Sequence, residues 1–257
     1  METTTPATIS SFRRDGYCVL PGLLDAGLIR RWRSLLGRHI AVAPPAPDHT
    51  GSYFLWPPLA QDTELRDLYE ISGIADAVQP FLRVGLGLPA PEVAQLAFTL
   101  PPHPHRPSAP HIDGLTPTED DGRPGTFTLL AGLLLTDQRQ RDRGNLWVWP
   151  GSHLRTAAWL REHGADALRG SAPYPPVELP APLQVIGSAG SLVLAHYLLA
   201  HNIGGHFGTA DDERRETVYF RLRAAGHRGR WRTTVTDPLS EFALPEQTGG
   251  SVTGDGR

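Results

Sequence analysis

The chain has 257 residues with 24 basic and 27 acidic side chains, which gives a net charge of −3 at neutral pH. All the basic residues are arginines, which excludes a Walker lysine, a Schiff-base lysine and a lysine general base. A net charge so close to zero gives no general attraction to nucleic acid or to an anionic membrane surface.

The first ninety residues are predicted to be largely helical. Apolar residues from Leu28 to Leu36 repeat at helical spacing, and Asp25 stands where an N-cap is expected. A second helical stretch is expected from about 63 to 82, with a break near residues 72–73. The segment between the two, SYFLWPPL, is predicted to be a proline-rich loop.

After Pro91 the pattern changes to short apolar segments separated by Gly, Pro, Asp and Ser, which is typical of an antiparallel β-barrel or sandwich. One helical insert, at about 154–168, interrupts the strands, and Ser152 is its expected N-cap. The predicted strands lie in VAQLAFTL, TFTLLAGLLL, NLWVWP, PLQVIG, SLVLAH and TVYFRL.

No repeat or linker divides the chain, so we predict one domain over residues 1–240. It comprises N-terminal helices over about 1–90 and a β core over about 91–235. The glycine-rich segment 241–257 is predicted to be a flexible tail.

His111 and Asp113 are the first candidates for chemistry. Residues two apart on a strand point to the same side, so this pair can direct an imidazole and a carboxylate to one point. An H-x-D triplet arises easily by chance, and a satisfied surface pair is the alternative. A third candidate, His201, ends an apolar strand far along the chain. Two histidines and one carboxylate form the facial triad of non-haem Fe(II) oxygenases, which leaves coordination positions open.

An iron site of this kind can bind a chelating keto acid, whose far carboxylate needs a partner. Arg215 is the candidate, because the planar guanidinium grips a carboxylate through two hydrogen bonds. Its neighbour Arg214 is the competitor. Thr217 lies on the same strand face as Arg215 and could add a hydroxyl donor. Gln95 is expected to point inward from its own strand, where it could contact the cosubstrate or the substrate.

Four motifs together resemble the phytanoyl-CoA dioxygenase family. They are H-I-D-G from His111, GNLWVWPGSH at 144–153, HYLLAH at 196–201 and RETVYF from Arg215. The opening FRRDGYCVLPGLL also resembles the N-terminus of that family.

The resemblance implies a mainly β fold with an α-helical N-terminal layer, built on a double-stranded β-helix, the jelly-roll or cupin-like barrel. It implies that His111, Asp113 and His201 ligate Fe(II) and that Arg215 binds 2-oxoglutarate, with dioxygen as the second cosubstrate. It makes His196 a histidine that is not a ligand.

This chain departs from the family at two positions. Ile203 stands where a small polar residue is common, and His206 stands where asparagine is common. Halogenating relatives replace the carboxylate of the ligand set with a small residue, so Asp113 indicates oxygen chemistry.

From these features we expect an enzyme that hydroxylates or otherwise oxidises an unactivated C–H bond of a small metabolite, in natural-product tailoring. The alternatives are a divalent-metal hydrolase, since the same donors suit zinc, and a non-catalytic metal-binding jelly roll. The expected partner is a small-molecule substrate, with no nucleic acid, membrane or obligate protein partner. A single cysteine and the lack of a signal-like N-terminus or membrane-length apolar run lead us to expect a cytoplasmic protein.

Overall fold

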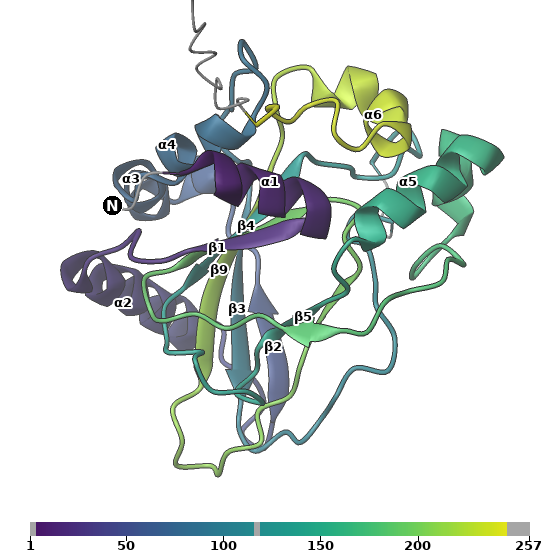
Figure 1. Ribbon diagram of the computed structural model, residues 1–257. Helices are drawn as coiled ribbons and strands as arrows, with labels where there is room; N and C mark the ends of the chain where they lie inside the picture. Colours follow the sequence, from purple (N-terminus) through teal and green to yellow (C-terminus); the bar gives the residue numbers. More distant parts are fainter. Residues whose placement is uncertain (1–3, 116–118, 246–257) are drawn as a thin grey trace, which may run out of the picture.

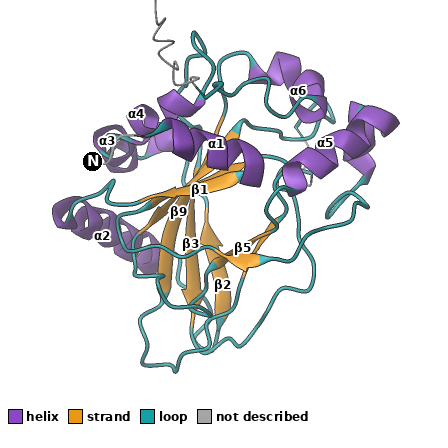
Figure 2. Cartoon of the chain, viewed as in Figure 1, coloured by secondary structure: helices purple, strands orange, loops and turns teal. Residues whose placement is uncertain are grey.

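Two antiparallel sheets form the centre of the computed structural model, which describes residues 4–115 and 119–245 (Figures 1 and 2). The large sheet contains, in spatial order, β1 (Tyr17–Leu20), β7 (Leu192–His196), β4 (Leu129–Leu134), β9 (Arg215–Leu222), β3 (Ala94–Leu100) and β2 (Gly51–Leu55). The small sheet contains β6 (Leu183–Gln184), β5 (Leu146–Val148) and β8 (His201–Ile203).

The two sheets have the jelly-roll arrangement that was predicted, but they are separate and do not close into a continuous barrel. Buried apolar side chains fill the space between them, including Leu146 and Val148 from the small sheet and Ala97, Leu130 and Val193 from the large one. The site described below lies on this inner side.

The four N-terminal helices pack against the large sheet, whereas the two later helices pack on each other and contribute to the core between the sheets. The helices are α1 (Pro6–Asp15), α2 (Ala26–Val42), α3 (Thr63–Ile71), α4 (Ile74–Val78), α5 (Ser152–His163) and α6 (His227–Thr236), with short 3-10 turns at Leu59–Gln61, Gln79–Phe81 and Ala165–Gly170. A second core forms between α1–α4 and the sheet, where the fully buried Trp32 of α2 meets Phe220 of β9 edge to face, with ring centroids 6.1 Å apart.

The two predicted N-terminal helical regions are confirmed at their boundaries. The Asp25 carboxylate accepts a hydrogen bond from the Leu28 backbone N–H at 2.8 Å and so caps α2. The break between α3 and α4 falls at Gly73, whose φ of +68° is a left-handed conformation that favours glycine.

Two strands interrupt the region that we predicted to be helical. β1 pairs with β7, and β2, which occupies part of the predicted proline-rich loop, pairs with β3 over five residues. Both strands are short and lie at the sheet edges, and their partners come from far along the chain. Such pairing leaves no strong local pattern, because tertiary contacts rather than propensity decide it. The sheet therefore draws strands from both sides of the expected boundary at residue 90.

The predictions for the C-terminal region and for the helix cap also need correction. Glu241 and Phe242, placed in the expected tail, are 3% and 4% exposed and belong to the packed fold. Residues 246–257, the rest of that predicted tail, lie outside the described residues. Ser152 is the first residue of α5 rather than its cap, since Gly151 occupies the cap position and the Ser152 hydroxyl instead accepts from the Ala200 N–H.

The side chains of β9 point alternately to the two cores, and this places several of them on the face that carries the site. Val218 and Phe220 point to the helix-covered core, whereas Tyr219 belongs to the core between the sheets. Because side chains alternate along a strand, Arg215 and Arg221 share the inner face with Tyr219.

Within the described residues, no helix combines the length and apolar character needed to cross a membrane.

Candidate metal centre

The structure brings the three predicted ligands together. The backbone N–H of His111 donates to the carbonyl oxygen of His201 at 2.9 Å, and the reverse hydrogen bond is 3.3 Å long. This single bridge places the two imidazoles side by side, with ring centroids 4.5 Å apart. His111 and Asp113 do not lie on a long strand as we expected, since Asp113 stands in the turn that follows the bridge.

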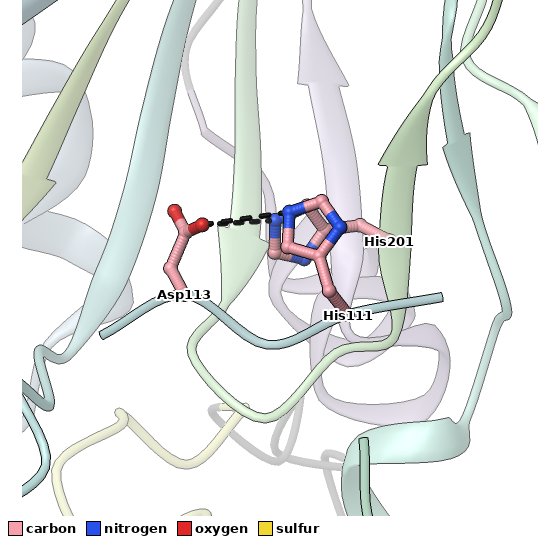
Figure 3. Close-up of side chains that lie close together, drawn as sticks. All are labelled: His111, Asp113 and His201. Atoms are coloured by element: carbon pink, nitrogen blue, oxygen red, sulfur yellow. Dashed lines mark ion pairs between the residues drawn. The ribbon is translucent and has the colours of Figure 1, made fainter. Parts of the chain in front are cut away.

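The Asp113 carboxylate faces both rings (Figure 3). Its Oδ1 lies 3.5 Å from Nε2 of His111 and 3.8 Å from Nε2 of His201. One potential ligand atom from each residue falls within 4.8 Å of the others, so the three donors are near enough to hold one ion. Within residues 4–115 and 119–245, no other group of His, Cys, Asp and Glu side chains meets this condition.

The environment of His201 leaves its Nε2 available as a ligand. The Nδ1–H donates to the carbonyl oxygen of Leu199 at 2.9 Å, which fixes the ring orientation and the tautomer. Burial, with a further contribution from His111, lowers the pKa of His201 to about 4. The ring is therefore neutral at neutral pH, the form in which imidazole binds a metal.

Asp113 is held in its charged form. Burial alone would raise the pKa of this carboxyl group, but a hydrogen bond with His111 and the positive charge of Arg221 outweigh that effect, so the pKa lies below its ordinary value. Arg221 contacts the second oxygen, Oδ2, through Nε at 3.2 Å and Nη2 at 3.1 Å. From the sequence, Arg221 belongs to a basic stretch that could face an anionic substrate or be solvated at the end of a strand; the structure instead places it against Asp113.

Arg215 and Arg214, the two candidates for binding the keto-acid carboxylate, differ in burial and in hydrogen-bond partners. Arg215 is 1% exposed, and its Nε donates to Oε1 of Gln138 at 3.2 Å while its Nη2 donates to the Tyr219 hydroxyl. Among the described residues, Nη1 of Arg215 has no hydrogen-bond partner although it is buried. Arg214 instead is partly exposed and pairs with Glu216 at 2.9 Å.

Polar groups from neighbouring strands surround Arg215. Thr217 is fully buried and its hydroxyl accepts from Nε2 of Gln138 at 3.1 Å, so it contacts Arg215 through the shared amide. Thr99 is paired with Arg215 across β3 and β9, and its buried hydroxyl also has no partner within the described part of the chain. Two unpaired buried polar groups on adjacent strands are unusual in a native fold and need a ligand or water to satisfy them.

The cavity beside the candidate ligands has a volume of about 440 Å³. Phe54 of β2 and the following Trp56 supply an aromatic wall, so the segment SYFLWPPL does line a cavity, from a strand and the residue after it rather than from a loop. Gln95 lines the cavity as expected from its inward direction on β3. The remaining lining residues are Ser52, His103, His105, His111, Asp113, Asn202, Ile203 and Arg221.

Arg215 lines a neighbouring cavity of about 480 Å³, at the end of β9 away from Arg221. The two cavities have no lining residue in common. The guanidinium group nevertheless extends along β9 from its Cα toward the ligand set, because its Nη2 reaches the hydroxyl of Tyr219, which lies four residues closer to Arg221.

His196 and His206, two further histidines considered from the sequence, make hydrogen bonds within the fold. His196 is buried, with Nε2 donating to the Pro238 carbonyl oxygen at 2.7 Å and Nδ1 accepting from the Leu198 N–H, so neither nitrogen is free for a metal. His206 likewise contacts the Glu213 carbonyl oxygen through Nε2.

A model of the family "Phytanoyl-CoA dioxygenase (PhyH)" matches residues 12–215. No curated protein sequence matches the chain.

Several solved structures share the fold. The carbocyclase SnoK from nogalamycin biosynthesis, described as non-heme and alpha-ketoglutarate dependent, is 21% identical with a TM-score of 0.60, and the match covers 86% of this chain and 87% of SnoK. The epimerase SnoN from the same biosynthesis is 23% identical with a TM-score of 0.54 over 83% of this chain and 79% of SnoN. HygX from Streptomyces hygroscopicus, with nickel and 2-oxoglutarate bound, is 18% identical with a TM-score of 0.56 over 86% and 87% of the two chains.

Proposed function

Since the chain belongs to the phytanoyl-CoA dioxygenase family, we propose that it is an Fe(II)- and 2-oxoglutarate-dependent oxygenase acting on a small molecule. His111, Asp113 and His201 are the proposed ligands, and Arg215 is the proposed partner of the far carboxylate of 2-oxoglutarate. The observation that carries the proposal is the meeting of two imidazoles and one carboxylate on the inner side of the jelly roll.

The donor set fits a ferrous ion. Two imidazole nitrogens and one carboxylate oxygen lie within 4.8 Å of one another, the donor set of the facial arrangement in non-haem iron oxygenases, and the cavity of about 440 Å³ adjoins them. When bound, iron supplies oxidation of a substrate C–H bond by dioxygen, coupled to the oxidative decarboxylation of 2-oxoglutarate. The protein residues orient the reactants and exclude water from them.

Arg215 suits the role of carboxylate partner for two reasons. Gln138 and Tyr219 hold its Nε and Nη2, so the side chain is fixed before a ligand binds. Its Nη1 and the Thr99 hydroxyl are buried polar groups that find no partner among the described residues and would be satisfied by a carboxylate. Gln138 then acts by holding the guanidinium, and Thr217 by holding the Gln138 amide, rather than by contacting the keto acid.

We further propose that the substrate is a small metabolite and that the outcome is oxidation of an unactivated C–H bond, with hydroxylation as the first candidate. Asp113 leaves no room for the chloride of halogenating relatives, which supports oxygen chemistry. SnoN is described as an epimerase and SnoK as a carbocyclase, so epimerisation and cyclisation are the competing outcomes on this fold.

The proposal is tested by anaerobic titration of the metal-free protein with Fe(II) and 2-oxoglutarate, monitored by the visible charge-transfer band of a chelated keto acid. We expect the band in the wild type and its loss in His201→Ala. Arg215→Ala should require at least tenfold more 2-oxoglutarate, which corresponds to losing about 1.4 kcal/mol or more of binding free energy.

Arg214→Ala is the matched control, because Arg214 adjoins Arg215 but is partly exposed and pairs with Glu216 instead, and it should titrate like the wild type. If Arg214→Ala and Arg215→Ala exchange these behaviours, the carboxylate partner is Arg214. If iron binds but no band forms, the oxygenase proposal fails, and the metal-hydrolase and non-catalytic alternatives replace it.

A further inference from the structure

The two oxygens of Asp113 have different surroundings. Oδ1 faces the imidazoles of His111 and His201 at 3.5 Å and 3.8 Å. Oδ2 faces away from them and receives two contacts from one guanidinium group, Nε of Arg221 at 3.2 Å and Nη2 at 3.1 Å. One oxygen is therefore directed to the candidate metal position and the other is occupied by protein.

Arg221 is held in place by aromatic rings as well as by the carboxylate. Its guanidinium carbon lies 5.0 Å from the ring centroid of Trp56 and 6.0 Å from that of Phe127. A guanidinium group stacks favourably on such faces. These rings come from the segments next to β2 and β4, so two separate parts of the fold fix the arginine that contacts Asp113.

The nearby Arg223 has other partners, so Arg221 is the arginine of this segment that contacts Asp113. Arg223, two residues further along the chain, donates to Oε1 of Glu119 at 2.9 Å and to the Thr126 carbonyl oxygen at 3.0 Å. Among the described residues, Arg221 forms an ion pair with Asp113 alone. Its side chain is 34% exposed and lines the cavity next to the ligands, so it is part of the site rather than of the outer surface.

We propose that Arg221 is a positioning residue of the metal centre: it occupies Oδ2 of Asp113 so that the carboxylate presents only Oδ1 to the ion. This inference rests on the function proposed above. A carboxylate that binds through both oxygens takes two coordination positions, and the proposed reaction needs the remaining positions for a chelating keto acid and dioxygen. Holding one oxygen keeps these positions open.

Two effects of Arg221 on metal affinity oppose each other. Its positive charge repels a cation, which would make the variant without the charge bind metal more tightly. Its hydrogen bonds orient the carboxylate, and loss of such outer contacts typically weakens metal affinity or activity about 10- to 100-fold. Because the aromatic stacking and the two contacts to Oδ2 fix one geometry, we expect orientation to dominate.

The test measures Co(II) binding to the metal-free protein, without 2-oxoglutarate or substrate, in the wild type, Arg221→Met, Arg221→Lys and Arg223→Met. The Co(II) visible spectrum reports both affinity and coordination number. We expect at least a tenfold higher dissociation constant for Arg221→Met, together with a changed spectrum at saturation. Arg221→Lys should be intermediate, since an ammonium group keeps the charge but offers no planar fork.

Arg223→Met is the matched control, because it removes a partly buried arginine just beyond the end of β9 without touching Asp113, and it should bind Co(II) within twofold of the wild type. Equal or tighter binding by Arg221→Met, with an unchanged spectrum, overturns the proposal. If Arg221→Met does not fold, a wild-type dissociation constant and spectrum for Arg221→Lys overturn it in the same way. If the wild type binds no Co(II), the metal centre itself is wrong and this inference falls with it.

Discussion

At the scale of single residues, Gly144 shows how closely the Arg215 side chain is enclosed. The φ of Gly144 is +80°, and a Cβ added there would lie 2.8 Å from Cδ of Arg215 and 2.9 Å from Cβ of Thr99. Such contacts are too short for a real side chain, and the backbone conformation itself disfavours residues other than glycine. The loop before β5 can approach the proposed carboxylate position because this residue has no side chain.

We therefore expect Gly144→Ala to displace Arg215 and to raise the dissociation constant for 2-oxoglutarate at least tenfold. The strained backbone should also cost on the order of 1–3 kcal/mol of unfolding free energy. Gly122→Ala separates the two effects, since Gly122 has a similar φ of +77° and, among the described residues, no atom lies within 4 Å of the added Cβ. It should lose stability but keep wild-type affinity in the same anaerobic titration. Equal 2-oxoglutarate affinity in both variants would contradict the close packing around Arg215.

The residues of the site differ in how far the sequence could reveal them. His111, Asp113 and His201 could be selected because their side chains match a known ligand set. Arg221 and Tyr219 follow from the period of two on the same strand once Arg215 is placed, although their residue types alone suggest nothing. Gln138 and Thr99 could not be found, because their contacts with Arg215 and Thr217 depend on pairing between distant segments.

At the scale of elements, the segment after α6 packs against α1. The ring of Phe242 is 4% exposed and lies 5.1 Å from that of Phe12 and 5.3 Å from that of His196, measured between centroids. The neighbouring Ala243 donates its N–H to the Phe81 carbonyl oxygen at 2.8 Å and accepts from Arg13 at 3.0 Å. Both ends of the described chain are thus fixed against each other.

Truncating this ring should destabilise the fold. We expect Phe242→Ala to lower the unfolding free energy by about 3 kcal/mol or more, the usual cost of removing a buried phenylalanine. Leu244→Ala is the control, because Leu244 is 75% exposed and its loss should cost less than about 0.5 kcal/mol. Urea unfolding followed by tryptophan fluorescence measures both changes. Similar midpoints for the two variants would show that packing of the segment after α6 does not contribute to the unfolding free energy.

The long elements could be predicted and the short edge strands could not. α2 carries a helical repeat and a capping aspartate, and β4 and β7 are continuous apolar segments buried along their whole length. β2 contains Tyr53 and Phe54 in a segment that ends at two prolines, and proline signalled a loop. Its strand structure depends on β3, which is formed by residues about forty positions later.

At the scale of the whole molecule, two buried histidines connect elements that are far apart in the sequence. Nε2 of His153, in α5, donates to the Arg13 carbonyl oxygen in α1 at 3.1 Å. Nε2 of His196, in β7, donates to the Pro238 carbonyl oxygen after α6, and the two rings lie 5.0 Å apart. Burial lowers the pKa of His153 to about 4, and burial together with the neighbouring His153 lowers the pKa of His196 well below its ordinary value.

This pair predicts how stability depends on pH. An unfolded chain protonates His153 near its ordinary pKa of 6.5, whereas the folded chain does so only near pH 4. Between these values the unfolded state binds more protons, so the unfolding free energy falls as the pH drops from about 6.5 to about 4. His153 alone accounts for on the order of 3 kcal/mol of that loss.

His153→Gln removes this titration while its amide can still donate to the Arg13 carbonyl oxygen, so its stability should fall less steeply between pH 6.5 and 4. His163→Gln, an exposed change on the same helix, should keep the wild-type slope. Urea midpoints measured at half-unit pH intervals give the three slopes. A wild-type slope in His153→Gln would contradict the prediction, because it would mean that His153 has the same pKa in the folded and the unfolded chain.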